Sequence, residues 1–172
     1  MDSDLETLLK TLRTTIEGMS EEQLQWCPAG KWSAGEVLEH LYLTYTGTIK
    51  GFERVLAAGR PLATRASMKN RVQALVVFSF NYLPAGRKAP PQTMPRGLAA
   101  ETIRTEIYGK IAAMDGIIAE CERRFGSRKL LDHPMLGPLT AKRWRRFHLI
   151  HGRHHAKQIA RLRQQTARPG TL

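Results

Sequence analysis

The sequence predicts an all-α fold, a bundle of helices, and three observations support this prediction. Apolar residues recur at helical spacing in several long segments. No segment shows the convincing apolar–polar alternation of a half-buried strand. The 172 residues are enough for one domain with a proper core. We therefore expect a single helical domain over residues 1–165 and a polar tail, 166–172, that frays.

The first third of the chain contains two predicted helices. Leucines at helical spacing, with Ser3 as a cap, predict a helix over 3–18, and Ser20 can start a short extra turn. The segment 27–32 then breaks the pattern. Ser33 and Glu36 form a capping box that begins a second helix, which ends near Gly59.

The middle of the chain is less regular. Residues 67–82 are apolar and partly β-branched, and their spacing predicts a helix; the residues that fit it are Val72, Leu75, Val76 and Phe80. Four prolines and two glycines between residues 84 and 97 predict an irregular excursion instead of an element. Such a loop is long for a small domain and often covers a site or an interface.

Two further helices are predicted in the last part of the chain. An isoleucine-rich stripe runs from Ile103 to Phe125, and Gly126 stops it. After a stretch with two prolines and Gly137, Thr140 caps a last helix that continues to about Gln165.

The net charge of +12 lies mostly on that last helix. Residues 1–132 carry 18 basic and 15 acidic side chains, whereas residues 133–172 carry nine basic and none acidic. The same final segment holds five of the six histidines. A strongly basic chain suggests nucleic acid or an anionic surface as a partner, so any proposed function must explain this segment.

Several classes of protein can be set aside. The longest apolar run, residues 74–78, is too short to span a bilayer, so we expect no membrane partner. The acidic start lacks the layout of a secretion signal. Cys27 and Cys121 form no CxxC, and no phosphate-binding glycine motif occurs. A cytoplasmic protein with reduced thiols is the expectation.

Two faces of the last helix differ in kind. At about 100° per residue, the inward face carries apolar and imidazole side chains together: Trp144, Phe147, His148, His151, His155, Gln158, Ile159 and Leu162. The opposite, solvated face carries Arg145, Arg146, Arg153 and Lys157. Long cations on an outer face are simply hydrated. Imidazoles in a core stripe are costly unless something binds them.

A divalent metal would satisfy these imidazoles. His151 and His155 are spaced i, i+4, so their rings project from consecutive turns toward one point. Neutral imidazole is the commonest protein ligand for zinc, nickel, copper and iron. The spacing matches neither HExxH nor the di-iron Glu-x-x-His pattern, so a third ligand must come from another helix. His40 is the histidine outside the last segment, and it flanks the inward stripe of the second helix.

At this point the chain resembles the DinB-like superfamily. The resemblance rests on Trp32 to Leu41 (WSAGEVLEHL) together with His151 to Ile159 (HGRHHAKQI), and the segments 83–90 and 133–140 resemble an uncharacterised branch of it. The resemblance implies a four-helix bundle with a long crossover connection and extra short helices. It also implies a metal held by His40, His151 and His155. Some relatives transfer low-molecular-weight thiols to electrophiles or hydrolyse small substrates.

Other residues near the predicted centre have supporting roles. Gln158 is the expected hydrogen-bond partner of a ligating imidazole. We interpret His148 as a packing residue instead of a fourth ligand, and His154 as a neighbour or surface group. Trp32 is either a packing anchor or a pocket-lining residue. No catalytic residue is assigned from the sequence.

These observations lead to competing hypotheses. The first is a metal-dependent thiol transferase or hydrolase that acts on a small molecule and uses zinc, nickel or iron. The second is a non-enzymatic basic bundle that binds nucleic acid, although exposed aromatics and known nucleic-acid motifs are missing. In a third, the metal only stabilises the fold. The oligomeric state stays open, with a homodimer through helix faces as one option.

Overall fold

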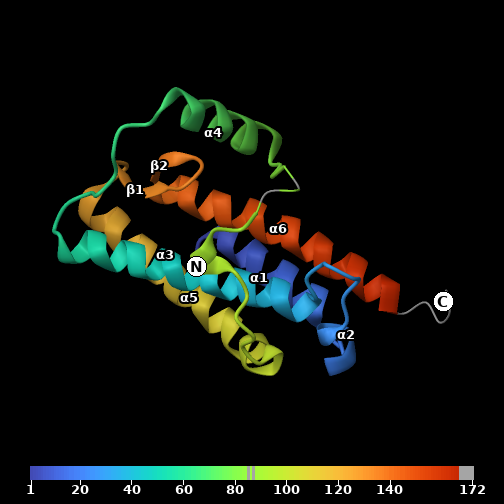
Figure 1. Cartoon of the computed structure of the whole chain (residues 1–172). Coiled ribbons are helices and arrows are strands. Elements are labelled where there is room, and N and C mark those ends of the chain that lie inside the picture. Colours follow the sequence, from blue (N-terminus) through green and yellow to red (C-terminus); the bar gives the residue numbers. More distant parts are fainter. Residues whose placement is uncertain (85, 87, 167–172) are drawn as a thin grey trace.

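Helices α1 (Ser3–Ile16), α3 (Ala34–Ala57), α5 (Ala100–Phe125) and α6 (Ala141–Thr166) lie side by side in a bundle (Figure 1). This computed structural model describes residues 1–84, 86 and 88–166. Helix α3 packs most extensively on α5, and α1 packs on α6. Leucines and isoleucines at helical spacing are buried between them, as the periodicity predicts. The prediction of a mainly helical chain is therefore confirmed.

Short helices fill the connections between the long ones. They are α2 (Glu21–Gln25), α4 (Met68–Phe80) and η1 (Pro91–Thr93). The predicted capping box of Ser33 and Glu36 is present at the start of α3, and Gly126 ends α5. The last helix ends at Thr166, so the rest of the predicted tail, 167–172, lies outside the described residues.

A small antiparallel hairpin replaces the strand-free connection that the sequence predicts before α6. It consists of β1 (Lys129–His133) and β2 (Gly137–Thr140). The register shifts between Lys129 and Leu131, and this bulge removes the period of two by which a strand is detected in a sequence. His133 closes the turn because its Nδ1 accepts two backbone N–H groups, 3.2 Å away.

Helix α4 confirms the predicted helix over 67–82 but is only partly buried. It packs beside β2, next to the hairpin in Figure 1, and its buried residues are Ala74 and Val77. Most of its apolar side chains are exposed: Met68, Val72, Leu75, Val76 and Phe80. No helix in the described part of the chain combines the length and the apolar character that a membrane crossing needs.

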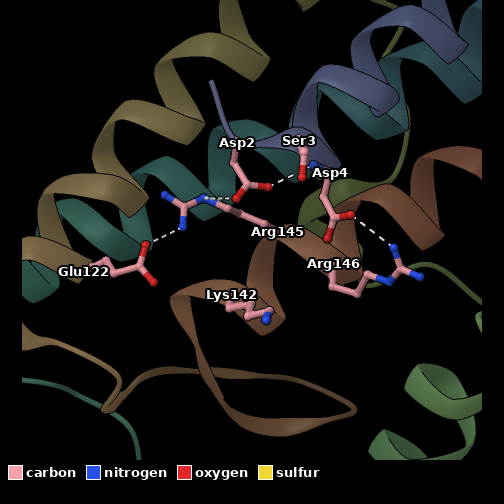
Figure 2. Close-up of a pocket in the computed structure, with 7 residues that line it drawn as sticks. All are labelled: Asp2, Ser3, Asp4, Glu122, Lys142, Arg145 and Arg146. Carbon is pink, nitrogen blue, oxygen red and sulfur yellow. Dashed lines mark hydrogen bonds and ion pairs between the residues drawn. The ribbon is translucent and has the colours of Figure 1, made fainter.

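Helix α6 is more deeply buried than predicted. Gly152 allows α1 to approach closely, because a Cβ at this position would clash with the side chain of Leu8. The prediction that Arg145 lies on the solvated face is wrong, because its side chain is only 7% exposed. Its guanidinium binds Asp115 of α5 at 2.8 Å and Glu122 at 2.5 Å, and Figure 2 shows the second of these ion pairs. These carboxylates compensate the buried charge of Arg145. The spacing of apolar residues along α6 cannot reveal such partners, because they come from another helix.

Candidate metal centre

Three histidines meet where α3 crosses α6. His40 comes from α3, and His151 and His155 come from consecutive turns of α6. One ring nitrogen of each lies within 4.8 Å of the others. The three residues are between 5% and 8% exposed, so this is a buried cluster and not a surface one. The structure thus brings together the three residues that the sequence nominates.

The Nε2 atoms of these rings converge. His151 Nε2 lies 3.2 Å from His40 Nε2 and 3.1 Å from His155 Nε2. Imidazole nitrogens bind zinc at about 2.0–2.1 Å, so two of them on one tetrahedral ion lie about 3.3 Å apart. The spacing of the donor set therefore fits a single divalent ion, with coordination positions left for other ligands.

Hydrogen bonds on the far side of two rings fix their tautomers. His40 Nδ1 lies 2.9 Å from the Thr93 carbonyl oxygen, and His155 Nδ1 lies 3.1 Å from Gln158 Oε1. Both oxygens accept, so each Nδ1 carries the proton and each Nε2 presents a lone pair to the centre. His151 could donate to only one of these lone pairs. A cation satisfies all three nitrogens at once.

The Nε2 atom of His151 lies near those of both other rings, and these are the polar contacts that His151 makes among the described residues. Its Nδ1 is buried without a hydrogen-bond partner among the described residues. The ring stacks on Phe147, with centroids 5.3 Å apart and an interplanar angle of 14°. An apolar face and an unpartnered nitrogen make this ring costly to bury unless Nε2 binds something.

Burial keeps these imidazoles neutral. Desolvation lowers the pKa of His40, against a smaller opposing effect of its bond to Thr93. Desolvation, with the nearby His40 and His154, lowers the pKa of His155 to about 3. Desolvation, followed by His155 and His40, holds the pKa of His151 well below its usual value. All three therefore present lone pairs near neutral pH, which is the form that binds a metal.

The other nominated residues surround the centre at different distances. Trp32 is half-buried, and its ring centroid lies 5.4 Å from that of His40. His154 is half-buried beside His155, with centroids 5.1 Å apart. His148 lies outside the convergent group: its Nε2 is 3.2 Å from Thr48 Oγ1, and its ring stacks on Trp144.

Sequence reasoning missed two contributors. The Thr93 carbonyl binds His40 across 53 residues of sequence, and a backbone acceptor carries no residue-type signal. Glu39 is 1% exposed and holds the loop that contains Thr93. An acidic residue beside His40 within the apolar run VLEHL was the available signal for Glu39, because buried carboxylates need partners.

His148 provides a test of burial through pH dependence. Complete burial lowers its pKa to about 3, below the 6.5 of an unfolded histidine. The unfolded chain therefore takes up this proton first, and stability falls as the pH drops below 6.5. We expect His148→Gln to reduce the slope of unfolding free energy against pH by about 1.4 kcal/mol per unit between pH 6 and 4.5. Urea titrations in constant chelator measure this slope, and an unchanged slope would exclude a buried, neutral His148.

A protein family matches most of the chain. The model of the family described as "Protein of unknown function (DUF1569)" matches residues 2–162, which include all three histidines of the cluster. No curated protein and no solved structure matches the chain. The centre itself must therefore support any functional assignment.

Proposed function

We propose that this chain, which belongs to the DUF1569 family of proteins of unknown function, is a metal-dependent enzyme. His40, His151 and His155 would hold one divalent ion, with zinc, nickel or iron as candidates. Three histidine ligands leave coordination positions open, as expected of a catalytic and not a closed structural site. The substrate would be a small molecule, with transfer of a low-molecular-weight thiol as the first reaction to test.

The convergence of lone pairs is the observation that supports this proposal. Two outer hydrogen bonds, donated by His40 Nδ1 to the Thr93 carbonyl and by His155 Nδ1 to Gln158 Oε1, turn the Nε2 atoms of both rings toward His151 Nε2. A cluster built only for packing would orient its rings so that each lone pair finds a donor. Here a cation is the partner that fits.

Membership of the DinB-like superfamily is part of the proposal. Its supports are the Trp32–Leu41 motif, the bundle of α1, α3, α5 and α6, and the long connection from α3 to α5. That connection contains α4 and η1, and it returns to the centre at Thr93. We therefore interpret it as the crossover that the resemblance implies.

The metal ion and two aromatic side chains would have different roles in the proposed reaction. A bound divalent ion lowers the pKa of a water or thiol and so supplies a nucleophile near neutral pH. Phe147 and the half-buried Trp32 provide apolar walls that exclude water around the reacting groups. In thiol transfer, sulfur bonds to the electrophilic carbon, the leaving group departs with its electron pair, and the thiol proton passes to solvent.

A thiol-transfer assay tests the proposed reaction. A panel of low-molecular-weight thiols is mixed with an activated aryl chloride, and the chloride released is measured with and without chelator. We expect turnover that falls at least about 100-fold on removal of the metal, because the ion is asked for roughly 3 kcal/mol of barrier lowering. Chelator-sensitive melting without turnover of any thiol or ester in the panel would favour a purely stabilising metal.

Nucleic-acid binding is the alternative, and exposed cations on α6 are the observation that favours it. They are Lys142, Arg143, Arg153, Lys157 and Arg161 in the described part of the chain. Arg145 and Arg146 do not extend this set, because ion pairs with Asp115 and Asp4 occupy them. Filter binding across a salt series separates the two functions, since phosphate contacts predict a steep loss of affinity with salt.

A further inference from the structure

The carboxylate of Glu39 accepts three backbone hydrogen bonds from one loop. Its Oε1 accepts from the N–H of Arg96 at 2.7 Å, and its Oε2 accepts from Gly97 and Leu98 at 3.1 and 3.2 Å. The side chain is 1% exposed, and no cation pairs with it in the part of the chain that the structure describes. Backbone dipoles therefore balance its charge.

The loop is shaped to meet this carboxylate. Gly97 has a φ of +85°, which turns consecutive N–H groups to the same side as in an anion-binding nest. A Cβ on Gly97 would meet no atom within 4 Å, so its positive φ, and not crowding, is what favours glycine. We call Glu39 together with residues 96–98 the loop clamp.

The clamp holds the same loop that orients a proposed metal ligand. Thr93 lies three residues before Arg96, and its carbonyl accepts from His40 Nδ1. Glu39 and His40, which are adjacent in α3, therefore both form hydrogen bonds with the segment 93–98. Without the clamp, backbone freedom would compete with the single bond between Thr93 and His40.

We propose that Glu39 is a positioning residue for the metal centre. By clamping residues 96–98 it keeps the Thr93 carbonyl on His40, which holds the proton on Nδ1 and leaves the Nε2 lone pair facing His151. Its importance for metal affinity rests on the proposed function, whereas its control of the His40 tautomer does not. Mutation of the residue that hydrogen-bonds to a ligating histidine typically lowers metal affinity 10–100-fold.

Two variants break the clamp from opposite sides. Glu39→Gln replaces one acceptor oxygen by an NH₂ group that faces backbone donors, and Gly97→Ala strains the positive φ. Each has a matched control. Glu36→Ala removes a carboxylate of the same helix that caps its start, and Gly126→Ala replaces another glycine of positive φ, +66°, with equally open space.

The experiment reads the His40 ring directly. Nitrogen-15 spectra of chelator-treated protein, assigned with His40→Gln, report which ring nitrogen carries the proton, and cobalt titrations report affinity. We expect both clamp variants to shift His40 from the Nδ1–H form to a mixture and to weaken cobalt binding about 10–100-fold. Both controls should stay within about twofold of the wild type.

An Nδ1–H signal for His40 that is unchanged in both clamp variants would overturn the positioning role, even if cobalt binds. Wild-type protein that binds no cobalt would instead overturn the proposed function. In that event the tautomer spectra still decide whether Glu39 controls His40. The two failures are therefore distinguishable.

Discussion

His151→Ala is expected to abolish tight metal binding while the chain stays folded. His151 Nε2 is the atom within 3.2 Å of both other Nε2 atoms, so its loss removes the central donor of the set. We expect affinity for zinc or cobalt to fall by more than about 100-fold, beyond the effect of outer partners. Competition titration against a chromogenic chelator measures the change.

The variant should tolerate this loss because the wild-type ring is poorly satisfied. His151 Nδ1 is buried without a partner among the described residues, so alanine removes an unpaired polar atom together with the apolar contact to Phe147. Circular dichroism checks the fold. His154→Ala, three residues on and half-buried, is the matched control and should keep wild-type affinity. Equal affinities for all three proteins would refute the assigned ligand set.

Arg145→Met is expected to give the largest loss of stability, about 3–5 kcal/mol. Asp115 is 11% exposed in its side chain and binds Arg145 Nε at 2.8 Å. Removing the guanidinium leaves a buried carboxylate without a cation, held by the backbone N–H of Asp2. Figure 2 shows the guanidinium between the N-terminal residues and Glu122. Denaturant unfolding, monitored by circular dichroism, gives the free-energy difference.

Arg146 offers the control for this prediction. It is the next residue of α6, but its side chain is 36% exposed and it pairs with Asp4 at 3.1 Å. Arg146→Met should therefore cost less than about 1 kcal/mol. The double variant Arg145→Met/Asp115→Leu should recover much of the loss, because the buried carboxylate is removed together with its cation. Glu122, the other partner of Arg145, is 42% exposed and is hydrated when the guanidinium is absent. Similar losses for Arg145→Met and Arg146→Met would show that burial of this ion pair does not govern stability.

Local signals made most of the helices predictable. The Ser33–Glu36 box, the isoleucine stripe of α5 and Gly126 each act within a few residues of sequence. The hairpin before α6 was missed because a bulge breaks the alternation of β1. The predicted exposure of Arg145 was wrong because its partners, Asp115 and Glu122, come from another helix.

In the candidate site, too, local features could be predicted from the sequence and long-range contacts could not. Helical spacing places His151 and His155 on one face, and the apolar surroundings of His40 indicate that it points inward. The contact of His40 with Thr93 could not be predicted, because it joins a side chain to a distant backbone carbonyl. Tertiary structure therefore adds the partners that fix ring tautomers, while the sequence indicates the rings.

The basic charge of α6 does not by itself indicate the function of the protein. Its exposed cations lie away from the face that carries the histidines, and Arg145 serves packing through its ion pairs. The basic surface of α6 would still attract anionic small molecules to the protein through long-range electrostatics. The net charge of +12 thus affects how ligands approach the protein, whereas the histidines form the candidate site.

Anomalous diffraction shows whether a metal ion occupies the three-histidine site. Crystals are grown from protein purified without chelator or nickel resin, and data are collected on both sides of the zinc, nickel and iron absorption edges. We expect one strong peak between the Nε2 atoms of His40, His151 and His155, with about one equivalent of metal bound per chain in solution. No peak at this position, together with less than about a tenth of an equivalent of any metal, would contradict this prediction.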